Sequence, residues 1–289
     1  MGKKVMIIDV AKCVGCYACQ IACKDEHVDN DWSPYTKPQP DTGSFWRRVE
    51  EIERGTFPKV KLTYIPINCM HCDSPPCIRA CRIGAIIKRA DGIVLINPEK
   101  CNGCVDIAKP LCLDACPYNT IYFNEKLRIA QKCTFCVHLI DGKDPLYKFG
   151  IPRCVDVCQK EAMIFGDEET LKDIIQKAEI LHPEYGVKPR VYYLNLPKPF
   201  IAGAVVDPSE DEVIEGAKVT AIDLFTGEKH ETLTDEFGDF WLRDLKWNHK
   251  YMIYIEKDGY LKKIVGIITT EKDVNLGDIE IYKYKKSNT

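Results

Sequence analysis

The chain has 289 residues, of which 45% are hydrophobic and 29% charged, with a formal net charge of −3. This composition is typical of a globular protein of about two domains, and the small negative charge argues against a nucleic acid as partner. No apolar run approaches the roughly 20 residues that span a bilayer, so we expect no direct membrane insertion.

Sixteen cysteines are the exceptional feature of the composition. All lie between Cys13 and Cys158, in four groups of four, quartets I to IV, that each begin with a C-x2-C pair. Disulfides of a secreted protein or structural zinc are alternatives. The first ten residues become charged too early for a signal peptide, and the recurrent C-x3-C ending is typical of iron–sulfur ligation by soft, anionic thiolates. We expect a cytoplasmic protein, unless a signal-bearing partner carries it across a membrane.

A short apolar strand is expected over residues 4–10, directly before quartet I: Cys13, Cys16, Cys19 and Cys23. The C-x2-C-x2-C-x3-C spacing puts three ligands on one tight loop and the fourth where a helix should begin. In bacterial ferredoxins the fourth cysteine of this pattern ligates a different cluster. A thiol far along the chain must therefore complete the first cluster.

Quartets II and III flank a predicted hairpin. Another strand is expected before them, over residues 59–65, and the Asp91-Gly92 turn between apolar runs is a hairpin signal. The candidate ligands are Cys69, Cys72, Cys77 and Cys81 in quartet II, and Cys101, Cys104, Cys112 and Cys116 in quartet III. Quartet, hairpin, quartet is the layout of a two-cluster ferredoxin module. The seven-residue spacer after Cys104 is longer than in a plain ferredoxin, so we expect an altered loop there.

Quartet IV is stretched, with seventeen residues between its second and third members: Cys133, Cys136, Cys154 and Cys158. Short apolar runs follow the last cysteine of quartets II, III and IV at a similar offset. Such a recurrence is an internal repeat, and we expect strands there that pack against the clusters. The runs are 86–87, 121–123 and 163–165.

The segment after quartet IV predicts a helix and then a connector. Asp167 is a candidate N-cap, an apolar stripe continues to Leu181, and His182-Pro183 would end the helix. Residues 187–199 are expected to be extended, with Tyr192 and Tyr193 buried against the cluster-bearing domain.

From residue 200 the pattern changes to short β-branched and aromatic runs separated by turns. It predicts a small antiparallel all-β sandwich or barrel, immunoglobulin-like or prealbumin-like. The expected strands are 200–206, 217–223, 229–234, 239–244, 251–256, 264–270 and 278–283. Without cysteines or a dense group of titratable residues, this domain is expected to bind or pack rather than catalyse. The fold class is therefore α+β, with ferredoxin-like modules in 1–166, a helix and connector in 167–199 and a β domain in 200–289.

The four quartets, with the runs Tyr64–Cys72 and Lys132–His138, resemble the four-cluster iron–sulfur subunits of molybdopterin oxidoreductases of the dimethyl sulfoxide reductase type. The resemblance implies four 4Fe–4S clusters and a nested pairing of quartet I with IV and II with III. The implied ligand sets are Cys13, Cys16, Cys19 with Cys158; Cys133, Cys136, Cys154 with Cys23; Cys69, Cys72, Cys77 with Cys116; and Cys101, Cys104, Cys112 with Cys81. All sixteen cysteines are used.

The run Gly186–Leu196 followed by a β domain resembles the small subunits of pyrogallol–phloroglucinol transhydroxylases. Those subunits lack part of one quartet and hold three clusters, whereas all four quartets are complete here. Because transhydroxylation has no net redox change, a full set of four clusters favours net electron exchange. We also expect an anaerobic organism, since the clusters are oxygen-sensitive.

We therefore expect an electron-transfer subunit without a catalytic site of its own. It would form a heterodimer or larger complex with a large molybdenum or tungsten pterin subunit, with hydroxylated aromatics as a candidate substrate class, and exchange electrons with an external donor or acceptor. A transhydroxylase subunit, a free-standing polyferredoxin and a zinc-stabilised scaffold are the alternatives.

Basic residues beside the quartets have two interpretations. Lys12, Lys100 and Lys132 each precede the first cysteine of a quartet, where a charge could tune a cluster, but we expect solvated lysines. His71 and His138 lie beside candidate ligands. With enough cysteines present, we expect them to form hydrogen bonds at a partner surface rather than to bind metal.

Overall fold

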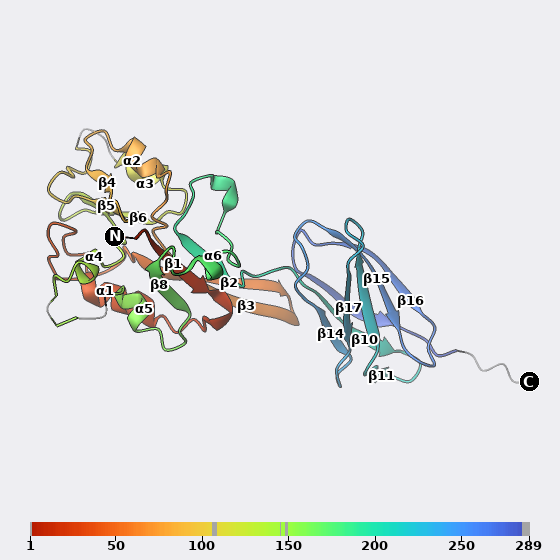
Figure 1. The fold of residues 1–289 in the computed structure, drawn as a ribbon. Helices are drawn as coiled ribbons and strands as arrows, with labels where there is room; N and C mark the ends of the chain where they lie inside the picture. Colours follow the sequence, from red (N-terminus) through yellow and green to blue (C-terminus); the bar gives the residue numbers. More distant parts are fainter. Residues whose placement is uncertain (1, 106–108, 145, 148–149, 285–289) are drawn as a thin grey trace, which may run out of the picture. The chain divides into compact units, whose positions relative to one another are not determined.

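The computed structural model describes residues 2–105, 109–144, 146–147 and 150–284 (Figure 1). The chain forms two compact units, which are described separately. The first comprises Met1–Glu51 and Tyr64–Leu196, and the second comprises Ile52–Thr63 and Pro197–Thr289.

A three-stranded sheet forms the centre of the first unit. Strand β1 (Lys4–Asp9) pairs antiparallel with β8 (Met163–Asp167) and parallel with β9 (Val191–Leu194) (Figure 1). Val5–Ile8 are at most 1% exposed, so both faces of β1 are covered, which explains its continuous apolar sequence. The expected first strand is confirmed, and so is the burial of Tyr193, whereas Tyr192 is only half-buried. The connector is extended as expected, and its residues Val191–Leu194 form β9.

Two further hairpins of the first unit each lie between two quartets. The turn expected at Asp91 and Gly92 is confirmed: the Asp91 carboxylate accepts a hydrogen bond from the Ile93 amide (3.2 Å), and Gly92 has a φ of +85°. The hairpin strands are β4 (Ile86–Lys88) with β5 (Val94–Ile96), and β6 (Ile121–Asn124) with β7 (Ile129–Lys132).

The strand that follows each of quartets II, III and IV pairs with the strand that precedes the next quartet. Strand β4 follows quartet II and pairs with β5, and β6 follows quartet III and pairs with β7. Strand β8 follows quartet IV and pairs with β1, which precedes quartet I, so the pattern closes on itself. The internal repeat expected from the sequence is confirmed.

A short helix begins next to the third cysteine of every quartet. That cysteine is the second residue of α1, α2, α3 or α5. Helix α1 packs against α5 and α2 against α3, so quartet I meets IV and II meets III. The helices of this unit are α1 (Ala18–His27), α2 (Pro76–Ala80), α3 (Leu111–Ala115), α4 (Val137–Ile140), α5 (Arg153–Asp156) and α6 (Lys172–Ile175), with 3-10 turns η1 (Val10–Lys12) and η2 (Pro183–Tyr185).

The expectation of a long helix after Asp167 is wrong. Asp167 ends strand β8, and α6 covers only four residues. The helix does not continue along the apolar stripe because Glu179 exchanges two backbone hydrogen bonds with Tyr193 of β9 (2.7 and 2.8 Å). This long-range pairing outweighs the local helical preference.

Strands β2 (Arg47–Thr56) and β3 (Lys59–Asn68) form a hairpin whose residues are divided between the two units. The sequence indicated β3 at a shorter length and missed β2, because charged residues dominate β2. Its alternation is still present where it begins: Arg47 and Val49 are buried, whereas Arg48 and Glu50 on the other face are half-buried.

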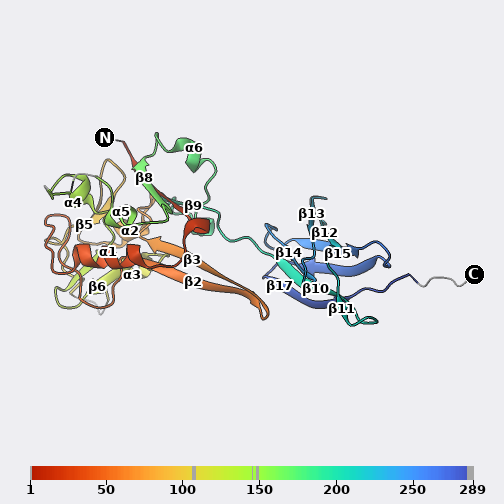
Figure 2. The ribbon, with the colours of Figure 1, turned by 90° about the horizontal axis from the view of Figure 1, so that it is seen from below.

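The second unit is a sandwich of two sheets (Figure 2). One sheet has the order β11-β10-β14, with β17 also paired to β10, and the other has the order β13-β12-β15-β16. Residues from both sheets, such as Val219, Phe240 and Ile253, form one buried apolar core. The strands are β10 (Ile201–Asp207), β11 (Glu212–Val213), β12 (Lys218–Asp223), β13 (Lys229–Leu233), β14 (Asp239–Leu242), β15 (Lys250–Glu256), β16 (Lys263–Thr269) and β17 (Val274–Glu280).

All seven expected strands of the sandwich are present, and β11 is an additional short one. The expectation that the sandwich is purely antiparallel is wrong, because β17 runs parallel to β10. After β16 the chain crosses to the other sheet, which places β17 beside β10 in the same direction. Local alternation predicts a strand but not its direction, and β17 also begins four residues earlier than expected.

The hairpin tip is anchored within the second unit by a buried ion pair. The Arg54 guanidinium donates to both carboxylate oxygens of Asp273 (2.8 and 2.7 Å), and its side chain lies over the rings of Phe200 and Trp247. Asp273 also accepts the Phe200 amide (3.0 Å). Residues 52–63 therefore belong to the β unit although they are distant from it in sequence.

Candidate iron–sulfur sites

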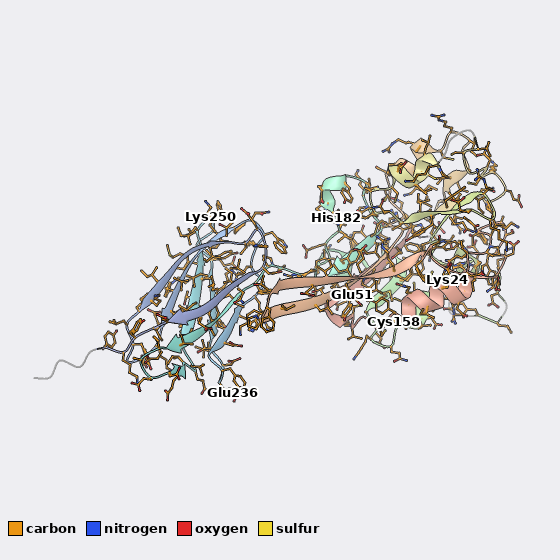
Figure 3. All side chains as sticks on the ribbon, turned by 180° about the vertical axis from the view of Figure 1, so that it is seen from behind. Lys24, Glu51, Cys158, His182, Glu236 and Lys250 are labelled. Carbon is orange, nitrogen blue, oxygen red and sulfur yellow. The ribbon has the colours of Figure 1, made fainter. Side chains whose placement is uncertain are left out.

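Two sets of four thiols each line one cavity of the first unit. These two cavities, named site 1 and site 3, are small, and each is bounded directly by its four thiols. The remaining lining of both is largely apolar. The thiols of site 1 are Cys13, Cys16, Cys19 and Cys158, the last labelled in Figure 3; those of site 3 are Cys69, Cys72, Cys77 and Cys116.

Site 2 consists of Cys23, Cys133, Cys136 and Cys154, which are buried together. Burial raises the pKa of Cys23 well above its ordinary value, and the charges of Cys133 and Cys154 raise it further. Burial likewise raises the pKa of Cys136, with added contributions from Cys23, Cys154 and Cys133. Thiolates that influence one another in this way lie close together.

Site 4 consists of Cys81, Cys101, Cys104 and Cys112. Burial raises the pKa of Cys112 to about 12, and the nearby charges of Cys101, Cys104, Cys77 and Cys81 contribute. Three of these four neighbours belong to site 4 itself. The altered loop expected after Cys104 includes residues 106–108, which lie outside the described residues.

The same electrostatic effects indicate which of the four sites are neighbours. Burial is the main cause of the raised pKa of Cys19 in site 1, and the charge of Cys154 in site 2 adds to it. Cys69 of site 3 contributes to that of Cys133 in site 2, and Cys77 of site 3 to that of Cys112 in site 4. The sites are therefore neighbours in the order 1, 2, 3, 4.

Backbone amides donate hydrogen bonds to thiol sulfurs at repeated positions. The Ala85 amide lies 3.2 Å from Cys81 Sγ and the Ala162 amide 3.3 Å from Cys158 Sγ, each four residues after the last cysteine of a quartet. Hydrogen bonds to sulfur are one of the means by which a protein sets the potential of a cluster.

The surroundings of sites 1 and 2 fit an anionic cofactor. Arg47 is 1% exposed, and its Nε and Nη1 atoms have no hydrogen-bond partner. A buried cation without a counter-charge is strongly unfavourable. A 4Fe–4S cluster with four thiolate ligands carries net negative charge and would supply the missing partner.

All sixteen cysteines are free thiols in the structure. Within the described residues, no three His, Cys, Asp or Glu side chains converge closely enough to hold a single metal ion. The thiols of sites 1 and 3 instead surround cavities, where a cluster rather than an ion would be held.

His71 and His138 form hydrogen bonds as expected, but their expected place at a surface is wrong, and so is the expectation of a solvated Lys132. Both histidines are fully buried rather than at a surface: His71 Nδ1 accepts the Val94 amide (3.0 Å), and His138 Nε2 lies 2.8 Å from Glu26 Oε1. Lys132 is 2% exposed and donates to backbone carbonyls. Because β7 and quartet IV fold into the centre of the unit, these side chains are removed from solvent. Lys12 and Lys100 are exposed, as expected.

The family model of a 4Fe-4S dicluster domain matches residues 60–168, and that of a carboxypeptidase regulatory-like domain matches residues 201–281. The chain belongs to the family of iron–sulfur subunits of molybdopterin oxidoreductases. It is an electron-transfer subunit that carries 4Fe–4S clusters and partners a large molybdopterin-containing catalytic subunit.

Among individual relatives, the chain is 38% identical to the pyrogallol hydroxytransferase small subunit of Pelobacter acidigallici, over 97% of this chain and 100% of that protein. It is 33% identical to a sulfite dehydrogenase subunit of Allochromatium vinosum, over 86% and 100% of the two chains. It is 32% identical to the arsenate respiratory reductase iron-sulfur subunit of a Shewanella species, over 66% and 95%.

The part of the chain that the structure describes holds no helix of the length and apolarity needed to cross a membrane.

Proposed function

We propose that this chain carries four 4Fe–4S clusters, one at each of sites 1 to 4, and that they form a single wire along which electrons pass to or from the pterin-containing partner. The observation that carries this proposal is the grouping of all sixteen thiols into four adjacent sets of four. Each set would use three cysteines of one quartet and the last cysteine of its paired quartet.

The clusters supply reversible one-electron transfer, and the residues of this chain hold and shield them. The cysteine thiols, most of them buried or half-buried, provide the ligands, which must lose their protons when iron binds. The apolar linings, such as Ile121 at site 3 and Met163 at site 1, limit the access of water. Such burial and hydrogen bonding set the potential of a cluster.

We further propose that the complex acts on a hydroxylated aromatic compound with net electron exchange. The similarity to the pyrogallol hydroxytransferase small subunit supports the substrate class. The four complete quartets support net exchange, since a transhydroxylation has no net electron demand. A transhydroxylase subunit remains the second candidate because the same relative matches the whole length of the chain.

The experiment uses the anaerobically purified complex with its large subunit. The clusters are reduced with dithionite, a hydroxylated aromatic such as pyrogallol is added, and paramagnetic resonance follows the reduced clusters. If the complex exchanges electrons with the aromatic compound, conversion of that compound should reoxidise the clusters stoichiometrically. Conversion of the aromatic with no change in the cluster signals would instead establish the transhydroxylase function.

We propose that residues 1–166 hold all clusters and that the β domain of residues 200–289 binds or packs; of the segment between them, residues 167–196 belong to the first unit and only 197–199 connect. A chain that ends at residue 199 should then keep its iron and sulfide; loss of iron would show that the β domain is required for cluster assembly.

We also propose a cytoplasmic location, where a reducing environment keeps cysteines available as cluster ligands. Fractionation of the native cells tests this location, and recovery of the complex outside the cytoplasm would contradict it.

A further inference from the structure

Two cations are buried inside the cluster-bearing unit without a carboxylate partner among the described residues. Arg47 and Lys132 are 1% and 2% exposed, and neither takes part in a salt bridge there. A buried charge normally requires an opposite charge close by. Their positions therefore indicate where negative charge resides in the loaded protein.

Arg47 lies between sites 1 and 2. Its Nη2 atom is 3.6 Å from Cys154 Sγ of site 2, and it contacts the thioether sulfurs of Met6 (3.0 Å) and Met163 (3.1 Å). Its charge lowers the pKa of Cys19 in site 1 and of Cys23 in site 2, against the larger opposing effect of burial. The guanidinium thus faces both sites at once.

Lys132 lies between sites 2 and 3. Its ammonium group donates to the carbonyl oxygens of Val94 and Cys133, the latter at 3.0 Å. Its charge opposes the rise in pKa that burial causes at Cys133 of site 2 and at Cys77 of site 3. Site 2 is therefore flanked by a cation on each of its two neighbouring sides.

Polar side chains also lie near the thiols of site 2. His27 Nε2 lies 3.8 Å from Cys136 Sγ, and Asn68 Nδ2 lies 3.9 Å from Cys133 Sγ. At site 4, by contrast, the donors to sulfur in the described residues are the amides of Ala85 and Ala130. Site 4, at the end of that order, therefore differs from site 2 in the charge and polarity around its thiols.

We propose that Arg47 and Lys132 are fixed counter-charges that raise the reduction potential of the cluster at site 2 above those of its neighbours, so that this cluster retains an electron within the wire. The inference rests on the proposed cluster assignment. A cluster held at site 2 would be reduced from the 2+ to the 1+ state by one electron from the external donor or the partner subunit. A fixed positive charge nearby stabilises the added negative charge.

The test is a potentiometric titration, followed by paramagnetic resonance, of the anaerobically purified protein in its complex. The cluster signal of site 2 is identified as the one that Cys133→Ser changes. Arg47→Gln removes one charge and Lys132→Gln the other, while Arg47→Lys keeps the charge. Lys100→Gln is the matched control, because Lys100 also precedes a quartet but is exposed.

We expect Arg47→Gln to shift the oxidised-to-reduced ratio of the site 2 cluster at least tenfold toward the oxidised form at a fixed potential, which is about 59 mV for one electron. Lys132→Gln should shift it in the same direction. Arg47→Lys should restore most of the effect, and neither Lys100→Gln nor the site 4 signal should change.

Iron and sulfide analysis separates the two ways of failing. Variants with full iron and an unchanged site 2 potential would overturn the role of Arg47 and Lys132 while leaving the cluster assignment intact. A native protein that lacks a cluster at site 2 would overturn the assignment itself. If Arg47→Gln loses iron, Lys132→Gln and Arg47→Lys decide: a potential equal to that of the native protein in Lys132→Gln contradicts the proposal.

Discussion

The two units differ in what holds them together. The second unit has a continuous apolar core between two sheets, with Val219, Tyr251 and Ile253 fully buried. In the first unit the hairpins β4–β5 and β6–β7 have strands of three or four residues, and the helices α2, α3 and α5 have four or five residues. Such short helices are not stable alone in water. The comparison suggests that the first unit depends on its cofactors, whereas the second unit does not.

Removal of iron should therefore have the largest effect, and only on one unit. Without clusters, buried thiols and the Arg47 cation lose their partners, and folding is coupled to metal in such sites. We expect hydrogen exchange to show loss of protection in the hairpins β4–β5 and β6–β7, with protection of β12 and β15 retained. Equal loss in both units would contradict the comparison.

Substitution of the one cysteine that a cluster takes from the paired quartet should disrupt that cluster alone. Because Cys158 lies in the cavity of Cys13, Cys16 and Cys19, Cys158→Ser should change the paramagnetic resonance signal of site 1. Cys154→Ser, four residues earlier, should instead change site 2. An effect of Cys158→Ser confined to site 2 would refute the nested pairing.

A cavity in the β core should destabilise the second unit alone. Ile253 is fully buried in β15, and Ile253→Ala should lower the free energy of unfolding of that unit by about 2–5 kcal/mol. Denaturation followed by tryptophan fluorescence of Trp241 and Trp247 measures this change. The iron content should stay constant; a parallel loss of iron would show that the units are not independent in stability.

The smallest expected effect is on the stability of the second unit at low pH. Burial alone would raise the pKa of Asp223, but the Phe225 amide (2.9 Å) and the His249 ring (2.7 Å) lower it to about 2. Since the ordinary value is near 4, this carboxylate stabilises the fold above about pH 4, and the contribution is lost as the pH falls toward 2.

Asp223→Asn should reduce stability at pH 7 and weaken its decline between about pH 5 and 2, as measured by urea denaturation of the second unit. A variant whose stability falls as steeply with acid as that of the native chain would exclude this role.

Much of the site could be predicted from sequence because cluster ligation is a local signal. The C-x2-C and C-x3-C spacings and the Asp91-Gly92 turn depend on residues a few positions apart. Arg47 could not be recognised: it is followed by a second arginine in a charged strand, and its burial results from packing against Met6 and Met163. Lys132 was misjudged for the same reason, since burial is decided by contacts distant in sequence.

The direction and the length of some elements also could not be predicted from local sequence patterns. The stripe after Asp167 has helical spacing, but Glu179 pairs with Tyr193. Strand β17 alternates like its neighbours and yet runs parallel to β10. In each case the partner that decides the structure lies elsewhere in the chain.

The central claim is that all four sites hold a complete cluster. The most direct measurement is the iron and acid-labile sulfide content of the anaerobically purified chain, with zinc determined in the same sample. The account predicts about sixteen iron and sixteen sulfide per chain, four of each for every cluster, and no stoichiometric zinc. A reproducible content of about twelve, or zinc in place of iron, would contradict it.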